Sequence, residues 1–191
     1  MRRRQLLAAV GTVAVGGVAG CSASSTTTPE SFTVSSPPLA GETLPERFTC
    51  DGAGQSPPFS IERVPDPTEA LAVTAEYDRG VINDPVLWTL WNVPADIEAV
   101  PAGLPRTPTV EALGGARQGR RQGGEVGYEP PCPPAGQPYT HRFQVYALGE
   151  RLAIEGGTDH DTATETIGNA VLASRRFTVE YTQPVTTEAE S

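Results

Sequence analysis

Proline and glycine punctuate this chain so often that long regular helices are excluded. The 191 residues include 19 prolines and 20 glycines. In a helix interior, proline costs about 3 kcal/mol and glycine about 1 kcal/mol relative to alanine. A helical bundle is therefore not expected. Because 38% of the residues are apolar, the chain can still fill one hydrophobic core, and we expect one compact folded domain.

The apolar residues fall into short runs bounded by Pro, Gly and Asp, which is typical of β-strands. Val, Trp, Tyr, Phe and Thr are common in these runs, and one of them alternates apolar and polar residues. Trp88 and Trp91 are three residues apart on one expected strand, so they should point to opposite faces, and at least one should lie in the core. We expect the strands of a β-sandwich at 32–34, 71–75, 86–93, 143–148 and 177–181.

One stretch has the three- and four-residue spacing of an amphipathic helix. It runs from about 159 to 174, and two capping boxes compete for its start, Thr162 with Glu165 or Thr158 with Asp161. The residues that recur on its apolar side are Ala163, Ile167, Ala170, Val171 and Ser174.

The excess of acidic residues limits which partners the protein can bind. All 14 basic residues are arginine, and they stand against 23 acidic residues, so the net charge is −9. Residues 1–20 hold three of the arginines and no acid, so the rest of the chain has 11 arginines, 23 acids and a net charge of −12. Such a surface repels nucleic acid and anionic membranes and stays soluble in high salt. We expect a salt-adapted (halophilic) protein with no nucleic-acid partner.

The beginning of the chain has the composition of an export signal. Arg2, Arg3 and Arg4 precede the uncharged run 6–20, which is too short to span a membrane but suits the apolar core of a signal peptide. The paired arginines resemble a twin-arginine signal, and the sequence Val-Ala-Gly-Cys that ends at Cys21 resembles a lipobox. We expect Cys21 to be the lipidated N-terminus of a lipoprotein on the outer face of the cytoplasmic membrane. The alternative is an ordinary secretory signal that leaves Cys21 as a free thiol.

The expected organisation has four parts. A Ser/Thr-rich stretch after the signal is too polar to be buried and is expected to form a solvated tether. Within the folded part, 104–127 is Gly-rich and lacks apolar periodicity, so we expect a long loop that is either functional or disordered. The boundaries are 1–20 for the signal peptide, 21–31 for the tether, 32–182 for the domain and 183–191 for a polar acidic tail.

Two cysteines remain once Cys21 is assigned to lipid. Cys50 and Cys132 form an even pair in a protein expected outside the cytoplasm, which favours a disulfide. The alternative is a pair of buried free thiols that behave as small apolar residues.

Several motifs in order resemble one family. They are Phe-Thr-Cys-Asp-Gly at 48–52, Ser-Pro-Pro-Phe-Ser at 56–60, the segment 127–134 with its proline-rich end, and Val-Tyr-Ala-Leu at 145–148. Over 32–182 the chain resembles the phosphatidylethanolamine-binding protein (PEBP) family, in its prokaryotic Raf kinase inhibitor-like branch. The resemblance implies a mainly all-β fold, a Greek-key β-sandwich with one or two peripheral helices. It also implies a small pocket for phosphate-bearing or similar anions and no accepted catalytic chemistry or cofactor.

The resemblance carries only part of the family's pocket onto this sequence. The acidic loop of the family falls on 76–80, which makes Glu76 the first acid, although a shift of two residues would select Asp78 instead. The family's His-Trp pair falls on Leu87 and Trp88, so the histidine, a potential anion donor, is lost.

The remaining pocket residues follow the proline-rich segment. Pro133 and Pro134 match the family's pocket wall, whereas the family's His-x-Tyr order is reversed to Tyr139 and His141. Since residues two apart in a strand share a face, both side chains can still reach one pocket. For His141, the alternative is a partly buried strand histidine that bonds to backbone.

These residues favour a binding module for a small anionic or phospholipid-headgroup-like ligand. An enzyme is not expected, because the sequence has no nucleophile elbow and no zinc-type spacing, although Glu76 with His141 is a conceivable acid–base pair. No metal site is expected in the Asp-His-Asp run at 159–161, because consecutive residues do not converge on one ion and acids there suit the helix dipole. The alternative function is a protein-interaction or inhibitor module, with a protease or envelope component as partner, that acts through the loop 104–127. The arginines of that loop, which either guide an anion or simply solvate the loop, are Arg117, Arg120 and Arg121.

Overall fold

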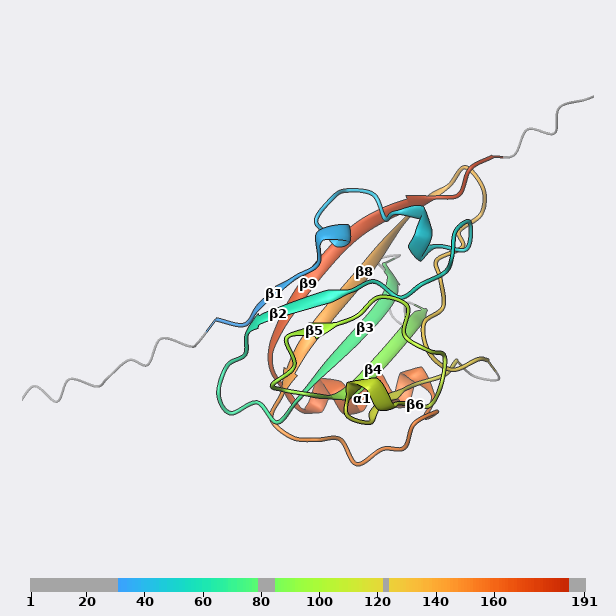
Figure 1. Ribbon diagram of the computed structural model, residues 1–191. Helices are drawn as coiled ribbons and strands as arrows, with labels where there is room; N and C mark the ends of the chain where they lie inside the picture. The colour runs from blue at the N-terminus through green and yellow to red at the C-terminus, as the bar shows by residue number, and fades with distance from the viewer. Residues whose placement is uncertain (1–30, 79–84, 122–123, 186–191) are drawn as a thin grey trace, which may run out of the picture.

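Two sheets and a helix are stacked in layers (Figure 1). The computed structural model describes residues 31–78, 85–121 and 124–185, so the expected signal peptide, Cys21 and nearly all of the tether lie outside the described residues. The larger sheet has six antiparallel strands in the order β6-β7-β4-β3-β8-β9, and the smaller has the order β1-β2-β5. This architecture confirms the expected mainly-β sandwich with a peripheral helix.

The two sheets contain four long strands, β3, β4, β8 and β9, and five short ones. The larger sheet consists of β3 (Ala70–Asp78), β4 (Val86–Pro94), β6 (Thr109–Val110), β7 (Ala116–Gln118), β8 (Pro138–Leu148) and β9 (Val171–Thr182). The smaller sheet consists of β1 (Thr33–Ser35), β2 (Phe59–Arg63) and β5 (Ala99–Val100). The helical elements are α1 (His160–Asn169) and the 3₁₀ turns η1 (Pro37–Leu39), η2 (Glu46–Phe48) and η3 (Glu111–Leu113).

Side chains of β3 alternate between the two faces of the larger sheet, and each face has its own hydrophobic core. Leu71, Val73 and Ala75 point toward the smaller sheet and pack in the main core. Ala72 points the other way and joins the second core, which contains Ala163, Ile167 and Ala170 from α1 and its C-terminus. Since successive side chains of a strand point to opposite faces, one strand supplies both cores.

The two tryptophans of β4 also divide between these cores. Trp88 lies in the main core and Trp91 in the core under α1, and both are fully buried. The expectation of opposite faces is confirmed, and both residues are core residues.

The five expected strands are all present, and four of them are longer than the apolar runs that predicted them. The strands β2, β5, β6 and β7 were not expected. Three of these have only two or three residues, which is too short for an alternating pattern to be recognised. The expected loop 104–127 is therefore partly ordered, because β6, η3 and β7 fall within it.

The helix prediction needs correction at both ends. Helix α1 ends at Asn169, and Val171 and Ser174 belong to β9, which pairs along its length with β8. Gly168 and Asn169 are poor helix formers, and the long strand pairing overrides the helical periodicity beyond them. At the start, Asp159 is the N-cap and its carboxylate accepts bonds from both the backbone N–H and the hydroxyl of Thr162, so neither expected capping box forms. Among the described residues, no helix is long and apolar enough to cross a membrane.

A disulfide joins the segment between β1 and β2 to the segment that precedes β8. Cys50 and Cys132, the pair named by the sequence prediction, are joined with a Cα–Cα distance of 5.4 Å and a sequence separation of 82 residues. Beside it, the hydroxyl of Tyr181 in β9 bonds to the carboxylate of Asp51, which also accepts a bond from Gln183. These contacts fix the turn at 49–52 against the end of β9.

We expect the double variant Cys50→Ala/Cys132→Ala to lose about 4 kcal/mol of unfolding free energy, because the chain-entropy model assigns roughly that value to a closed loop of this length. Urea denaturation of the oxidised parent and the variant measures the difference. Mass spectrometry of non-reduced peptides checks the cross-link, and two freely alkylated thiols in the native parent would contradict it.

Candidate functional site

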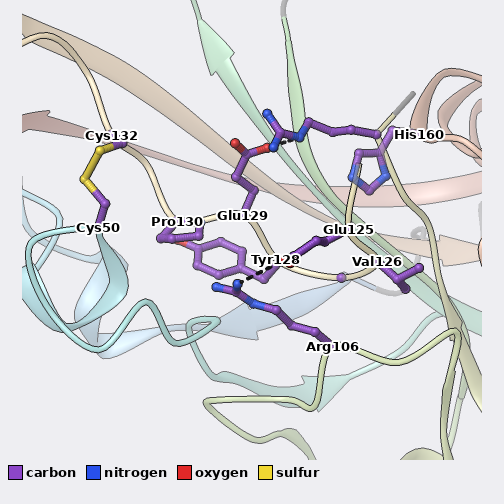
Figure 2. A pocket seen from close by; sticks show the side chains of 11 residues that line it. Cys50, Arg106, Glu125, Val126, Tyr128, Glu129, Pro130, Cys132 and His160 are labelled. Atoms are coloured by element: carbon purple, nitrogen blue, oxygen red, sulfur yellow. Dashed lines mark ion pairs between the residues drawn. A yellow bond between two sulfur atoms is a disulfide. The ribbon is translucent and has the colours of Figure 1, made fainter. Parts of the chain in front are cut away.

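A hollow of about 280 Å³ opens beside the disulfide, along the segment that leads from β7 toward β8 (Figure 2). Charged side chains from separate loops face it, together with one buried tyrosine and the first residue of α1. The lining residues are Cys50, Arg106, Arg121, Glu125, Val126, Gly127, Tyr128, Glu129, Pro130, Cys132 and His160.

Backbone and ring contacts hold the wall of this hollow in place. The N–H of Glu129 donates to the carbonyl of Leu87 in β4 at 2.9 Å, and the N–H of Gly127 donates to the carbonyl of Gly119 at 2.9 Å. Gly127 has φ +92, and a Cβ there would lie 3.2 Å from the Cα of Arg106, so this close approach requires glycine. The wall is therefore an extension of the sheet rather than a free loop.

Tyr128 attaches the same wall to the main core. Its ring meets that of Trp88 edge to face at 5.6 Å, and its hydroxyl donates to the carbonyl of Phe48 at 2.7 Å. Burial raises the pKa of Tyr128 above its ordinary range, so it stays a neutral donor. Trp88 in turn donates from Nε1 to Oε1 of Gln118 at 2.8 Å. Trp88 thus supports the site from the core and does not line the hollow.

Two arginine–glutamate pairs make the hollow charge-balanced. Arg121 Nε lies 2.6 Å from Glu129 Oε2, and Arg106 Nη1 lies 3.6 Å from Glu125 Oε2. Both arginine side chains are about half exposed, with 56% and 43% of their surface accessible. Partial burial raises the pKa of Glu129, while the positive charges of Arg121 and Arg106 oppose that rise. The Arg106–Glu125 pair can open toward a ligand at small cost, because exposed ion pairs contribute at most about 1 kcal/mol. Opening the Arg121–Glu129 pair costs more, because the Glu129 side chain is only 30% exposed.

His160 closes one end of the hollow as the first residue of α1. It is 4% exposed, and its Nδ1 lies 2.9 Å from the hydroxyl of Thr89 in β4. Gly119 passes so close to this pair that a Cβ there would lie 2.7 Å from Nδ1 of His160. Burial, and secondarily the charge of Arg121, lower the pKa of His160 to about 4, so the imidazole is neutral at pH 7.

Tyr139 and His141 lie together on one face of β8, in accord with the two-residue spacing. They surround Tyr77 of β3, with ring centroids 5.7 Å and 5.0 Å from that of Tyr77. The Tyr77 hydroxyl accepts a bond from the N–H of Cys132 at 3.3 Å, so this aromatic cluster lies behind the disulfide end of the hollow. His141 is fully buried, and burial lowers its pKa to about 4.

Glu76 points away from this cluster. In the register of β3 and β8, Tyr77 pairs with His141 and Glu76 pairs with Arg142, so Glu76 and His141 lie on opposite faces of the sheet. Arg142 Nη2 lies 2.5 Å from Glu76 Oε2, and the same guanidinium pairs with Asp78 at 3.1 Å. The structure therefore does not bring Glu76 and His141 together as an acid and a base.

The remaining predicted residues lie near the hollow but not in its lining. Leu87 is 2% exposed and packs in the main core, Pro133 is buried, and Pro134 is exposed. Of the three loop arginines, Arg121 lines the hollow, whereas the guanidinium of Arg117 donates to Thr109 at 2.7 Å and Arg120 is exposed.

Sequence reasoning missed Arg106, Glu125, Glu129 and His160 as site residues. Their convergence depends on how three loops fold, and no spacing in the sequence signals it. In the part of the chain that the structure describes, no group of three His, Cys, Asp or Glu side chains is arranged to hold a metal ion.

Comparison with known proteins identifies relatives over most of the folded region. The family model described as phosphatidylethanolamine-binding protein matches residues 34–182. The UPF0098 protein of Methanothermobacter thermautotrophicus is 31% identical over 136 residues, which are 70% of this chain and 87% of that protein. A UPF0098 protein of Pyrococcus horikoshii is 34% identical over 117 residues, which are 61% of this chain and 59% of that relative.

A solved structure has the same fold. The crystal structure of YbcL from Escherichia coli, a member of the mammalian PEBP family, matches with a TM-score of 0.71 and 27% identity, and the match covers 79% of this chain and 98% of YbcL.

The buried histidines predict an acid-sensitive fold. Because the pKa of His141 is lower in the folded state, about 4 against an unfolded value near 6.5, stability falls as the pH drops from about 6.5 toward 4. Between pH 7 and pH 5 we expect His141 alone to account for about 2 kcal/mol of lost unfolding free energy.

Urea denaturation of the parent and of His141→Leu at both pH values tests this. The variant should lose about 2 kcal/mol less than the parent over the same interval. Equal losses in the two proteins would show that His141 is not held neutral by burial.

Proposed function

Because this chain belongs to the phosphatidylethanolamine-binding protein family, we propose that it is a binding module for a small phosphate-bearing zwitterion of the phospholipid-headgroup type, held in the hollow beside the disulfide. The observation that carries this proposal is that two arginine–glutamate pairs line the same hollow. The proposed function is binding without chemistry on the ligand.

The charge pattern favours a zwitterion over a simple anion. A phosphate matches the guanidinium groups of Arg106 and Arg121, since guanidinium presents donors in a fork that fits phosphate oxygens. Glu125 and Glu129 line the same hollow, so an anion alone would meet two carboxylates. An ammonium group on the same ligand provides partners for those carboxylates, and phosphoethanolamine carries both groups. The ammonium group also reduces the repulsion that the acidic surface, with a net charge of −12 over residues 21–191, exerts on an anion.

We further propose that the domain works at the outer face of the cytoplasmic membrane, anchored through lipid on Cys21. The arginine run, the short apolar segment and the Val-Ala-Gly-Cys sequence support this. Ten residues, 22–31, separate Cys21 from the folded part. A random coil of that length has an end-to-end distance of roughly 15–20 Å, which would hold the start of the folded part close to the headgroup layer.

We expect calorimetric titration to detect binding of phosphoethanolamine, with weaker binding of phosphate or of ethanolamine alone. Arg121→Gln and Arg106→Gln should each weaken phosphoethanolamine binding about 10-fold or more, because a hydrogen bond to a charged group is worth about 1.5–3 kcal/mol.

Arg63→Gln is the matched control, since it removes one exposed arginine of β2 that does not line the hollow. The proposal fails if this control weakens binding as much as the two site variants, or if no headgroup compound binds the parent.

The anchor is tested separately by fractionation of cells that produce the parent or Cys21→Ala. We expect the variant to be released from the membrane fraction, because it lacks the acyl chains that hold the parent there. A variant that stays as membrane-bound as the parent would contradict lipidation of Cys21.

A further inference from the structure

A second hollow lies on the other side of His160. Its volume is about 290 Å³, and its lining consists of Pro85, Val86, Arg121, Asp159, His160 and Asp161. Arg121 and His160 line both hollows, so these two side chains form the wall between them.

The imidazole in this wall has one unused hydrogen-bonding atom. Nδ1 of His160 lies 2.9 Å from the Thr89 hydroxyl, and the backbone N–H of His160 donates to the carbonyl of Arg120 at 2.8 Å. Nε2 is buried and has no hydrogen-bond partner among the described residues. Buried polar atoms are normally paired, so an unpaired one needs an explanation, such as a water or a ligand that completes it. Both ring nitrogens of His141 also lack a partner among the described residues, but His141 lines neither hollow. Because the His160 side chain lines both hollows, a ligand that occupies them is a suitable partner for Nε2.

The chemistry of the second hollow selects a neutral polar group. The carboxylates of Asp159 and Asp161 border it and repel an anion, while Pro85 and Val86 provide an apolar side. Asp159 already accepts two bonds from Thr162, as the cap of α1. A hydroxyl group suits the unpaired Nε2, because a hydroxyl both donates and accepts and therefore fits either tautomer of a neutral imidazole.

We propose that the second hollow is a subsite for the free glycerol part of a glycerophosphoethanolamine-type diester, with His160 Nε2 as its hydrogen-bonding partner. This inference rests on the proposed function, in which the phosphate sits with Arg106 and Arg121 in the first hollow. A phosphate that draws Arg121 away from Glu129 opens the wall in which Nε2 lies. The ligand class is then the deacylated diester, because the glycerol of an intact phospholipid carries acyl esters where the diester has free hydroxyls.

Calorimetric titration of the full-length protein with two soluble probes tests the subsite. Glycerophosphoethanolamine should bind the parent about five-fold more tightly than phosphoethanolamine, the gain typical of one neutral hydrogen bond. In His160→Phe the ratio of the two affinities should fall to about one, whatever the substitution does to the affinity for phosphoethanolamine itself. Equal affinities of the parent for the two probes would overturn the subsite and leave the proposed function standing, whereas no binding of either probe would overturn both.

Nuclear magnetic resonance of the parent's imidazole nitrogens decides the question even where His160→Phe does not fold. The chain contains two histidines, and the core residue His141 serves as an internal reference. Glycerophosphoethanolamine should shift the Nε2 signal of His160 and leave His141 unchanged, and phosphoethanolamine should shift His160 Nε2 much less. An unchanged His160 signal at saturating glycerophosphoethanolamine would refute the inference. Tighter binding to vesicles that contain phosphatidylethanolamine than to the soluble diester would refute the assignment to a deacylated ligand.

Discussion

The rest of the structure depends on the burial of strand β3 between two hydrogen-bonded neighbours and two cores. Residues 70–75 are all buried, β4 and β8 pair with its two edges, and its side chains alternate between the main core and the core under α1. A strand with no free edge and no exposed face in that stretch cannot shift its register without moving apolar side chains to the wrong face. The site inherits this rigidity, because Tyr77 lies near the end of β3, Thr89 lies in β4 and His141 lies in β8.

How much the sequence could predict depended on whether a feature is local. Two-residue periodicity correctly placed Tyr139 with His141, and the three-residue spacing of Trp88 and Trp91 correctly separated them. The alternation of side chains along β3 also excludes Glu76 from that cluster. This conclusion requires the pairing of Tyr77 with His141, which is known only from the folded sheet.

The parts of the site that come from loops could not be predicted. Arg106 and Glu125 are separated by β6, η3 and β7, elements too short to be recognised from the sequence, and their pairing depends on the path of those elements. The predicted C-terminal end of the helix was wrong for a related reason. The pairing of β9 with β8 is a nonlocal contact, and it outweighs the local helical pattern.

The disulfide has a consequence for cleavage of the chain. Cys50 and Cys132 enclose β2 to β7, including both central strands β3 and β4 and the arginines of the hollow. A protease that cuts one peptide bond anywhere between these cysteines leaves the two fragments joined through sulfur, so the cut segment stays attached to β8 and β9. The protein can thus be nicked at an exposed loop between Cys50 and Cys132 and remain one covalent molecule, which suits a domain expected to work where secreted proteases act.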